Sequence, residues 1–127
     1  MSYKDKAVFR SPQLIDHLTN PRNPGELEEA DAAVSVTNPV CGDELKLSLK
    51  VEDGRIGDVR FKAYGCAAAL AASSLLTEMV KGKTLEEARA ITRQDISEGL
   101  GGLPRHKAHA GDLAEDALNE ALDQLEK

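Results

Sequence analysis

Alternating hydrophobic and polar residues mark the strands in the first half of the chain. Residues 45–51 alternate with a period of two, which is typical of a half-buried strand. A second run covers residues 56–64, and Asp53-Gly54 between the two runs is a hairpin signal. The shorter apolar segment 33–36 predicts one more strand. We therefore expect a three-stranded antiparallel meander, whose apolar face needs a cover of helices.

Helical patterns flank these strands. Ser11 and Pro12 are typical of an N-cap and first helical position, and the turn-forming residues 20–25 end this short helix. Its predicted apolar face carries Leu14, Ile15 and Leu18. An Ala- and Leu-rich helix is expected from Cys66 to about residue 81, where Gly82 stops it.

A helix starting near residue 84 and a last helix near the C-terminus are also predicted. Between them, residues 92–104 are expected to form a short helix and loops. Residues 84–87 have the pattern of a capping box, which marks the start of the first of these helices. The last helix is amphipathic, and its apolar stripe consists of Leu113, Ala117, Leu118, Ala121, Leu122 and Leu125. The predicted fold class is α+β: a small three-stranded antiparallel sheet packed against a layer of helices.

Length and composition fit this fold. The 127 residues suit a single domain over residues 1–127, in which the charged start, residues 1–10, is expected to be flexible. Tryptophan is absent and aromatic residues make up only 3% of the chain, so the core must consist of Leu, Ile, Val and Ala.

Charge excludes several classes of function. The chain has 22 acidic and 16 basic residues, a net charge of −6, and no basic stripe with interleaved aromatic residues, so nucleic-acid binding is not expected. No apolar run approaches the roughly 18–20 residues of a membrane span. The N-terminus lacks the pattern of a secretory signal. We expect a cytoplasmic protein without a membrane segment.

The two cysteines are the main candidates for chemistry, since a structural disulfide is not expected in a reducing compartment. Cys41 precedes Gly42, which permits a tight backbone bend, and Asp43 adds an oxygen ligand nearby. Cys66 stands at a strand-to-helix junction, where the positive end of the helix dipole favours a thiolate. Alternatively, each cysteine is a small buried hydrophobic residue.

Histidines add nitrogen ligands to the candidate set. His106 and His109 are three positions apart near the start of the last helix, a spacing that suits a zinc or iron ligand pair or two solvated surface residues. His17 is interpreted as a packing or helix-end residue, as are Ser73 and Ser74. The sequence has no Gly-rich phosphate loop and no evident acid–base or nucleophile pair, so an enzyme is not expected.

Five motifs follow one another along the chain, at residues 16–25, 39–43, 61–66, 76–88 and 113–117. In order and spacing they resemble those of a known family, the iron–sulfur cluster assembly scaffolds IscU and the N-terminal domain of NifU. The resemblance runs from about His17 to the C-terminus. No insertion precedes position 110, so the IscU type fits better than the zinc-dependent SufU type.

The resemblance implies a task as well as a fold. A scaffold of this family holds iron and sulfide while a [2Fe–2S] cluster forms, and then releases the cluster to recipient apo-proteins. Sulfur comes from a cysteine desulfurase partner, and zinc is a possible occupant of the resting site. The residues implied as metal ligands are Cys41, Asp43, Cys66 and His109.

The chain departs from the family pattern at three places. Ala110 stands where the family has a third cysteine, which makes His106 a candidate substitute ligand. Residues 67–69 are alanines where the family favours Gly-Ser-Ala. The candidate partner-binding residues Leu103, Pro104 and Lys107 match only part of the segment that some relatives present to an Hsp70-type chaperone, so the resemblance gives no firm basis for chaperone binding.

These departures leave three interpretations open. The first is a working scaffold in which Cys41, Cys66 and His109 are joined by Asp43 or His106, or in which two subunits each give two cysteines to one bridging cluster. The protein is then a monomer or a cluster-bridged homo-oligomer. The second is a divergent zinc- or iron-binding module that docks a cysteine desulfurase without assembling a cluster. The third is a metal-free interaction domain.

Overall fold

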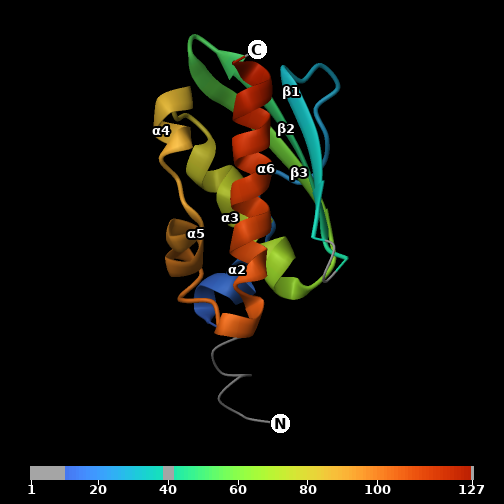
Figure 1. Cartoon of the computed structure of the whole chain (residues 1–127), viewed down its shortest axis with the longest axis vertical. Coiled ribbons are helices and arrows are strands. Elements are labelled where there is room, and N and C mark those ends of the chain that lie inside the picture. The colour runs from blue at the N-terminus through green and yellow to red at the C-terminus, as the bar shows by residue number, and fades with distance from the viewer. Residues whose placement is uncertain (1–10, 39–41, 127) are drawn as a thin grey trace.

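The protein consists of an antiparallel sheet with helices packed over one of its faces (Figure 1). The computed structural model describes residues 11–38 and 42–126. The sheet has three strands in the order β1 (Ala32–Thr37), β2 (Glu44–Glu52) and β3 (Arg55–Tyr64), and both neighbouring pairs are antiparallel. The predicted meander is therefore confirmed. The segment 1–10, predicted to be flexible, lies outside the described residues.

Sequence alternation decides which face of the sheet is covered. Leu45, Leu47 and Leu49 on β2 are at most 1% exposed, while the residues between them are more accessible or polar. In the register of the sheet, Leu47 pairs with Val34 on one side and Phe61 on the other. Cross-strand apolar neighbours of this kind stabilise a half-buried sheet, and they form the floor on which the helices pack.

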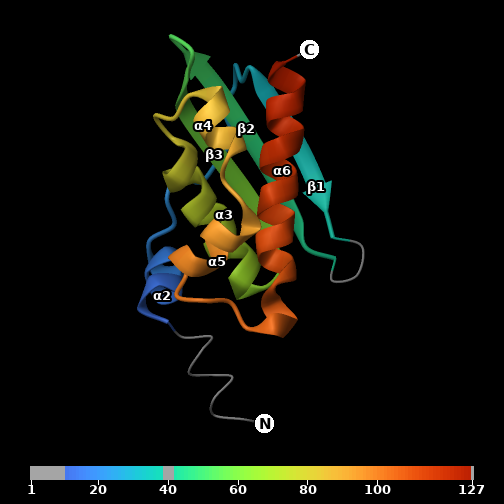
Figure 2. The same ribbon diagram turned by 60° about the vertical axis from the view of Figure 1, so that its left-hand side comes forward.

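The helices are α2 (Pro12–Thr19), α3 (Ala67–Val80), α4 (Leu85–Arg89), α5 (Arg93–Gly99) and α6 (His109–Leu125), with a 3₁₀ turn at Arg105–Lys107. The long helices α3 and α6 lie side by side on the sheet, as both views show (Figures 1 and 2). The predicted stripe of α6 faces this layer, since Leu118 and Leu122 are fully buried. Among the described residues, no helix has the length and apolar character to cross a bilayer.

Local capping signals define the helix starts. The Ser11 hydroxyl accepts a hydrogen bond from the backbone N–H of Leu14 at 3.1 Å. At α4 the Thr84 hydroxyl accepts from the Glu87 N–H while the Glu87 carboxylate accepts from the Thr84 N–H, so the predicted capping box is confirmed. Each of these contacts satisfies a backbone donor that the first helical turn leaves free.

One prediction for α2 is wrong. Ile15 is 42% exposed, although it was expected on the apolar face with Leu14, which is 2% exposed. The buried position is taken by His17, three residues after Leu14 and on the same helical face. A polar side chain tolerates this place because Ser74 of α3 provides a hydrogen-bond partner at 2.8 Å.

The turn-rich segment after α2 covers the edge of β3. The Gly25 N–H donates to the Phe61 carbonyl at 2.8 Å, and the Phe61 N–H donates to the Asn23 carbonyl at 3.0 Å. These bonds satisfy strand groups that an open edge would expose. They also fix the last part of β3, which leads through Gly65 to Cys66.

Candidate metal centre

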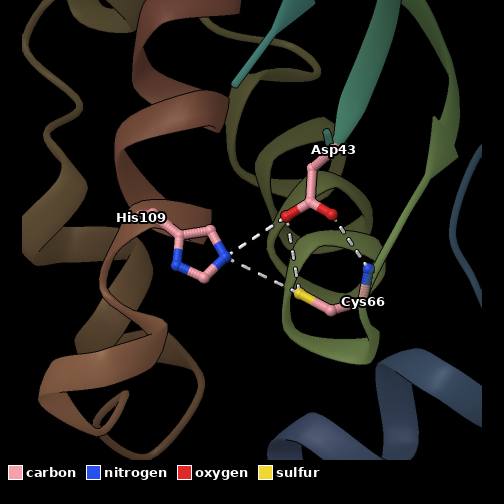
Figure 3. A group of neighbouring side chains, drawn as sticks. All are labelled: Asp43, Cys66 and His109. Atoms are coloured by element: carbon pink, nitrogen blue, oxygen red, sulfur yellow. Dashed lines mark hydrogen bonds and ion pairs between the residues drawn. The ribbon is translucent and has the colours of Figure 1, made fainter. Parts of the chain in front are cut away.

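Three candidate ligands meet where β2 begins, β3 ends and both long helices start (Figure 3). Asp43 immediately precedes β2, Cys66 is the N-cap residue of α3, and His109 is the first residue of α6. The Cys66 side chain makes no capping hydrogen bond to its helix, so its sulfur is directed to the other two residues. The fold thus brings together three side chains that are far apart in the sequence.

The three ligand atoms converge on one point. Asp43 Oδ2 lies 3.2 Å from His109 Nε2, Cys66 Sγ lies 3.6 Å from the same oxygen, and Sγ lies 3.8 Å from Nε2. Around one tetrahedral zinc ion, the sulfur would lie about 3.6 Å from the oxygen and from the nitrogen, and the nitrogen would lie about 3.3 Å from the oxygen. The spacing in this protein is already close to one face of such a tetrahedron.

The same geometry argues against acid–base catalysis. In a cysteine–histidine–aspartate relay, the carboxylate binds the ring nitrogen that faces away from the nucleophile. Here both Asp43 and Cys66 face Nε2 of His109. The arrangement is not that of a proton relay, and the three atoms are grouped so that they could bind one ion.

The site is partly exposed to solvent. The His109 side chain is 21% exposed and Cys66 is half-buried, whereas the Asp43 side chain is only 4% exposed. Asp43 uses its second oxygen within the protein, because Oδ1 accepts a hydrogen bond from the Cys66 backbone N–H at 3.2 Å. One carboxylate oxygen is therefore fixed internally and the other is presented to the site.

The remaining predicted site residues fall into different places. Cys41 lies outside the described residues. His106 is in the 3₁₀ turn Arg105–Lys107, before α6 begins, and its side chain is not described. Both histidines lie near the start of α6, as expected: His106 is in the 3₁₀ turn just before that helix, and His109 is its first residue. Ala110 is 1% exposed and belongs to the apolar core.

The candidate partner-binding residues lie just before the site. Leu103, Pro104 and Lys107 are all half-buried, and the Leu103 N–H donates to the Ser97 hydroxyl at 2.9 Å. The Lys107 N–H donates to the Pro104 carbonyl at 2.8 Å, which closes the 3₁₀ turn. This segment is thus held against α5 and leads into His109.

His17 does not join the candidate ligands. It is 5% exposed, and its Nδ1 atom lies 2.8 Å from the Ser74 hydroxyl. Burial lowers the pKa of His17 below the ordinary histidine value, because a charged imidazolium is disfavoured away from water. The interpretation of His17 as a packing residue fits this environment.

Sequence reasoning missed one residue of the site, Gly65. Its backbone has a φ of +142°, a conformation that favours glycine, and it separates the end of β3 from Cys66. The signal was present in the sequence as a glycine at a strand-to-helix junction, beside a cysteine. Its contact with Asp43 becomes visible only in the folded chain.

The fold and the site together define an α+β domain with one cysteine, one histidine and one aspartate grouped so that they could hold a metal ion. Residues 10–127 match the family model described as NifU-like N terminal domain, and the chain belongs to this family. The proteins to which it is similar include the iron–sulfur cluster assembly scaffold protein IscU of Escherichia coli K12. That protein is 52% identical over 116 residues, which cover 88% of this chain and 90% of the relative.

Other relatives agree with this assignment. The iron–sulfur cluster assembly scaffold protein IscU 1 of Archaeoglobus fulgidus is 54% identical over 112 residues, covering 88% of this chain and 73% of the relative. Among solved structures, a nitrogen-fixing NifU-like protein (N-terminal) from Brucella abortus superposes with a TM-score of 0.75 at 24% identity, covering 96% of this chain and 97% of that one. The fold class and the family resemblance predicted from the sequence are both confirmed.

Proposed function

We propose that this protein is a scaffold on which iron–sulfur clusters are assembled before transfer to recipient proteins. Its relatives at about half identity are named as such scaffolds. The observation that carries the proposal for this chain is the convergence of Asp43, Cys66 and His109, whose ligand atoms all lie within 4.8 Å of one another. The protein is a carrier and not an enzyme, and its place of action is the cytoplasm.

The ligand set of the cargo consists of Cys41, Asp43, Cys66 and His109. Two thiolates, one imidazole and one carboxylate provide four ligands, the number that a [2Fe–2S] cluster or a tetrahedral zinc ion requires. Thiolates suit iron–sulfur clusters, while a carboxylate is the ligand of harder ions. A mixed set of this kind holds a cluster less firmly than four thiolates, which suits a site that must release it.

Assembly of a cluster on this scaffold also needs a supply of sulfur. A cysteine desulfurase is the proposed source, and recipient apo-proteins are the proposed acceptors. His106 is proposed as a substitute ligand. The residues proposed to contact a partner are Leu103, Pro104 and Lys107, which precede His109 in the sequence. Binding of an Hsp70-type chaperone is not part of the proposal.

Anaerobic reconstitution with iron, sulfide and thiol tests this function. We expect a coloured species with equal amounts of iron and sulfide, which is lost in Cys41→Ala and in Cys66→Ala. Ser73→Ala is the matched control in α3, since the Ser73 hydroxyl donates to the Ala69 carbonyl of its own helix at 2.7 Å and to no other described residue. Retention of colour in both cysteine variants would refute the proposed ligand set.

Stoichiometry and zinc content distinguish the remaining forms. One cluster per chain supports a monomer, and one cluster per two chains supports a cluster-bridged homo-oligomer. Zinc in the isolated protein fits a resting form of the scaffold. Tight zinc binding without any cluster formation would instead indicate the zinc- or iron-binding module, and would overturn the scaffold proposal.

A further inference from the structure

The space above Gly65 is occupied by the carboxylate of Asp43. A Cβ atom added at Gly65 would lie 2.0 Å from Asp43 Oδ1, 2.6 Å from Cγ and 3.0 Å from Cβ. Contacts below 3.0 Å do not occur for real Cβ atoms, so a side chain at position 65 and the present Asp43 conformation exclude each other. The glycine is required here for close approach, in addition to its φ of +142°.

This close approach determines which partner each oxygen of the Asp43 carboxylate has. Oδ1 lies over Gly65 and accepts the Cys66 N–H at 3.2 Å, while Oδ2 lies 3.6 Å from Cys66 Sγ and 3.2 Å from His109 Nε2. One oxygen is committed to the backbone and one is presented to the site. Asp43 is also 3% exposed, so it has no open solvent into which it could turn without losing these contacts.

We infer that Gly65 is a positioning residue of the metal centre. Because Gly65 has no side chain, the Asp43 carboxylate can occupy the space above it, and in that position Asp43 acts as a ligand through Oδ2 alone. This inference rests on the proposed role of Asp43, Cys66 and His109 as ligands. A carboxylate that gives one oxygen occupies a single coordination position. The other positions stay available to the thiolate, the imidazole and incoming sulfide.

Substitution Gly65→Ala tests the inference, with Co²⁺ as a spectroscopic substitute for zinc. The added methyl group must displace the Asp43 carboxylate from the Cys66 N–H. We expect Co²⁺ affinity to fall about 10- to 100-fold, the usual effect of losing a group that orients a metal ligand. The d–d absorption bands of bound Co²⁺ should also change in position or intensity, because the oxygen ligand is lost or shifted.

A matched glycine separates this effect from backbone strain. Gly82 also has a positive φ, +85°, but a Cβ there would meet nothing within 4 Å, and it lies at the far end of α3. Gly82→Ala therefore also places a side chain at a positive φ, which strains the backbone, without touching the site. It should lower thermal stability and leave the Co²⁺ affinity and spectrum as in the unsubstituted protein.

A double substitution makes the test specific for Asp43. In an Asp43→Gly background the carboxylate is gone, so Gly65→Ala should cause no further loss of Co²⁺ affinity. If the two losses add, Gly65 does not act through Asp43 and the inference is overturned, as it is if folded Gly65→Ala binds Co²⁺ with the original spectrum. Failure of the unsubstituted protein to bind Co²⁺ would instead refute the proposed metal centre itself.

Discussion

The buried imidazole of His17 and the hydroxyl of Ser74 are hydrogen-bonded, with 2.8 Å between Nδ1 and Oγ, and this contact joins α2 to the middle of α3. The same hydroxyl accepts a hydrogen bond from the Arg22 backbone N–H at 2.8 Å. Ser74 therefore serves both the helix before the turn-rich segment and the segment itself. Among the described residues, every buried side-chain nitrogen and oxygen has a partner.

Substitution Ser74→Ala should destabilise the fold. It removes the acceptor of the Arg22 N–H and the partner of His17, and buried groups left without partners cost about 1–3 kcal/mol. Ser73→Ala is the control, because Ser73 is equally buried but bonds only to a carbonyl of its own helix, whose loss costs less than about 1 kcal/mol. Urea unfolding measures both, and equal losses would contradict this role of Ser74.

Acid should weaken the fold through His17. Burial is the main cause of its lowered pKa, the positive charge of Arg22 adds to it, and the carboxylates of Glu78 and Asp16 oppose it. The unfolded chain then binds a proton more readily than the folded one. The stability that neutral His17 contributes is fully present above its pKa in the unfolded chain, 6.5. It is lost as the pH falls through the lower pKa that His17 has in the folded chain.

The test compares the free energy of unfolding at about pH 7.5 and about pH 5.5, on either side of the ordinary histidine pKa of about 6.5. The unsubstituted protein should lose more stability between these values than His17→Gln, which keeps a polar group near Ser74 but does not titrate. All other residues are common to both proteins. An identical loss in both would show that His17 does not contribute.

Elements whose signals lie between residues close together in the sequence could be predicted. Strict alternation over residues 45–51 predicts β2, and Thr84 with Glu87 predicts the start of α4, because both signals are local. The second capping box, in which Thr92 pairs with Asp95, was not predicted, because aspartate replaces the usual glutamate or glutamine at that position. The burial of His17 in place of Ile15 depends on Ser74, which lies on another helix.

The candidate site was predictable only in part for the same reason. Cys66 was recognised at its strand-to-helix junction, Asp43 by its place two residues after Cys41, and His109 by its spacing from His106. The family resemblance then implied that they belong to one ligand set. No spacing in the sequence shows that these three side chains meet, because they come from three elements that only the sheet and the α3–α6 pair bring together. The contact between Gly65 and Asp43 has no local signal at all.

Substitution Asp43→Ala should slow release of an assembled cluster. An oxygen ligand exchanges more easily than a thiolate on iron, so the carboxylate is the natural point at which a recipient begins to displace the scaffold. We expect transfer to an apo-ferredoxin to slow by about tenfold, the order of effect seen when a group around a metal centre is removed. Affinity for a single ion falls in the same variant, since that depends on the number of ligands and not on their exchange.

The control for this prediction is Asp43→Asn. Asparagine has nearly the same shape and can still accept the Cys66 N–H, so it keeps the local structure while removing the negative charge. Visible circular dichroism during transfer gives the rate for all three proteins. Faster transfer from Asp43→Ala than from the unsubstituted protein would count against a labile role for this carboxylate.

Substitution Ala110→Cys should strengthen cluster retention. Position 110 directly follows His109 at the start of α6, and the family resemblance implies a third cysteine there. Ala110 is 1% exposed, so the added sulfur enters a packed region and should cost about 1–3 kcal/mol of stability. A third thiolate should nevertheless slow the loss of a reconstituted cluster to a chelator.

Ala110→Ser is the matched control, because it adds an atom at the same place without a thiolate. If Ala110→Cys retains the cluster longer than both Ala110→Ser and the unsubstituted protein, the site is a scaffold that works with one ligand fewer and can accept another. If both variants lose the cluster at the same rate, the side chain at position 110 does not reach the cargo. The ligands would then be complete without it, and the alanine would have a packing role only.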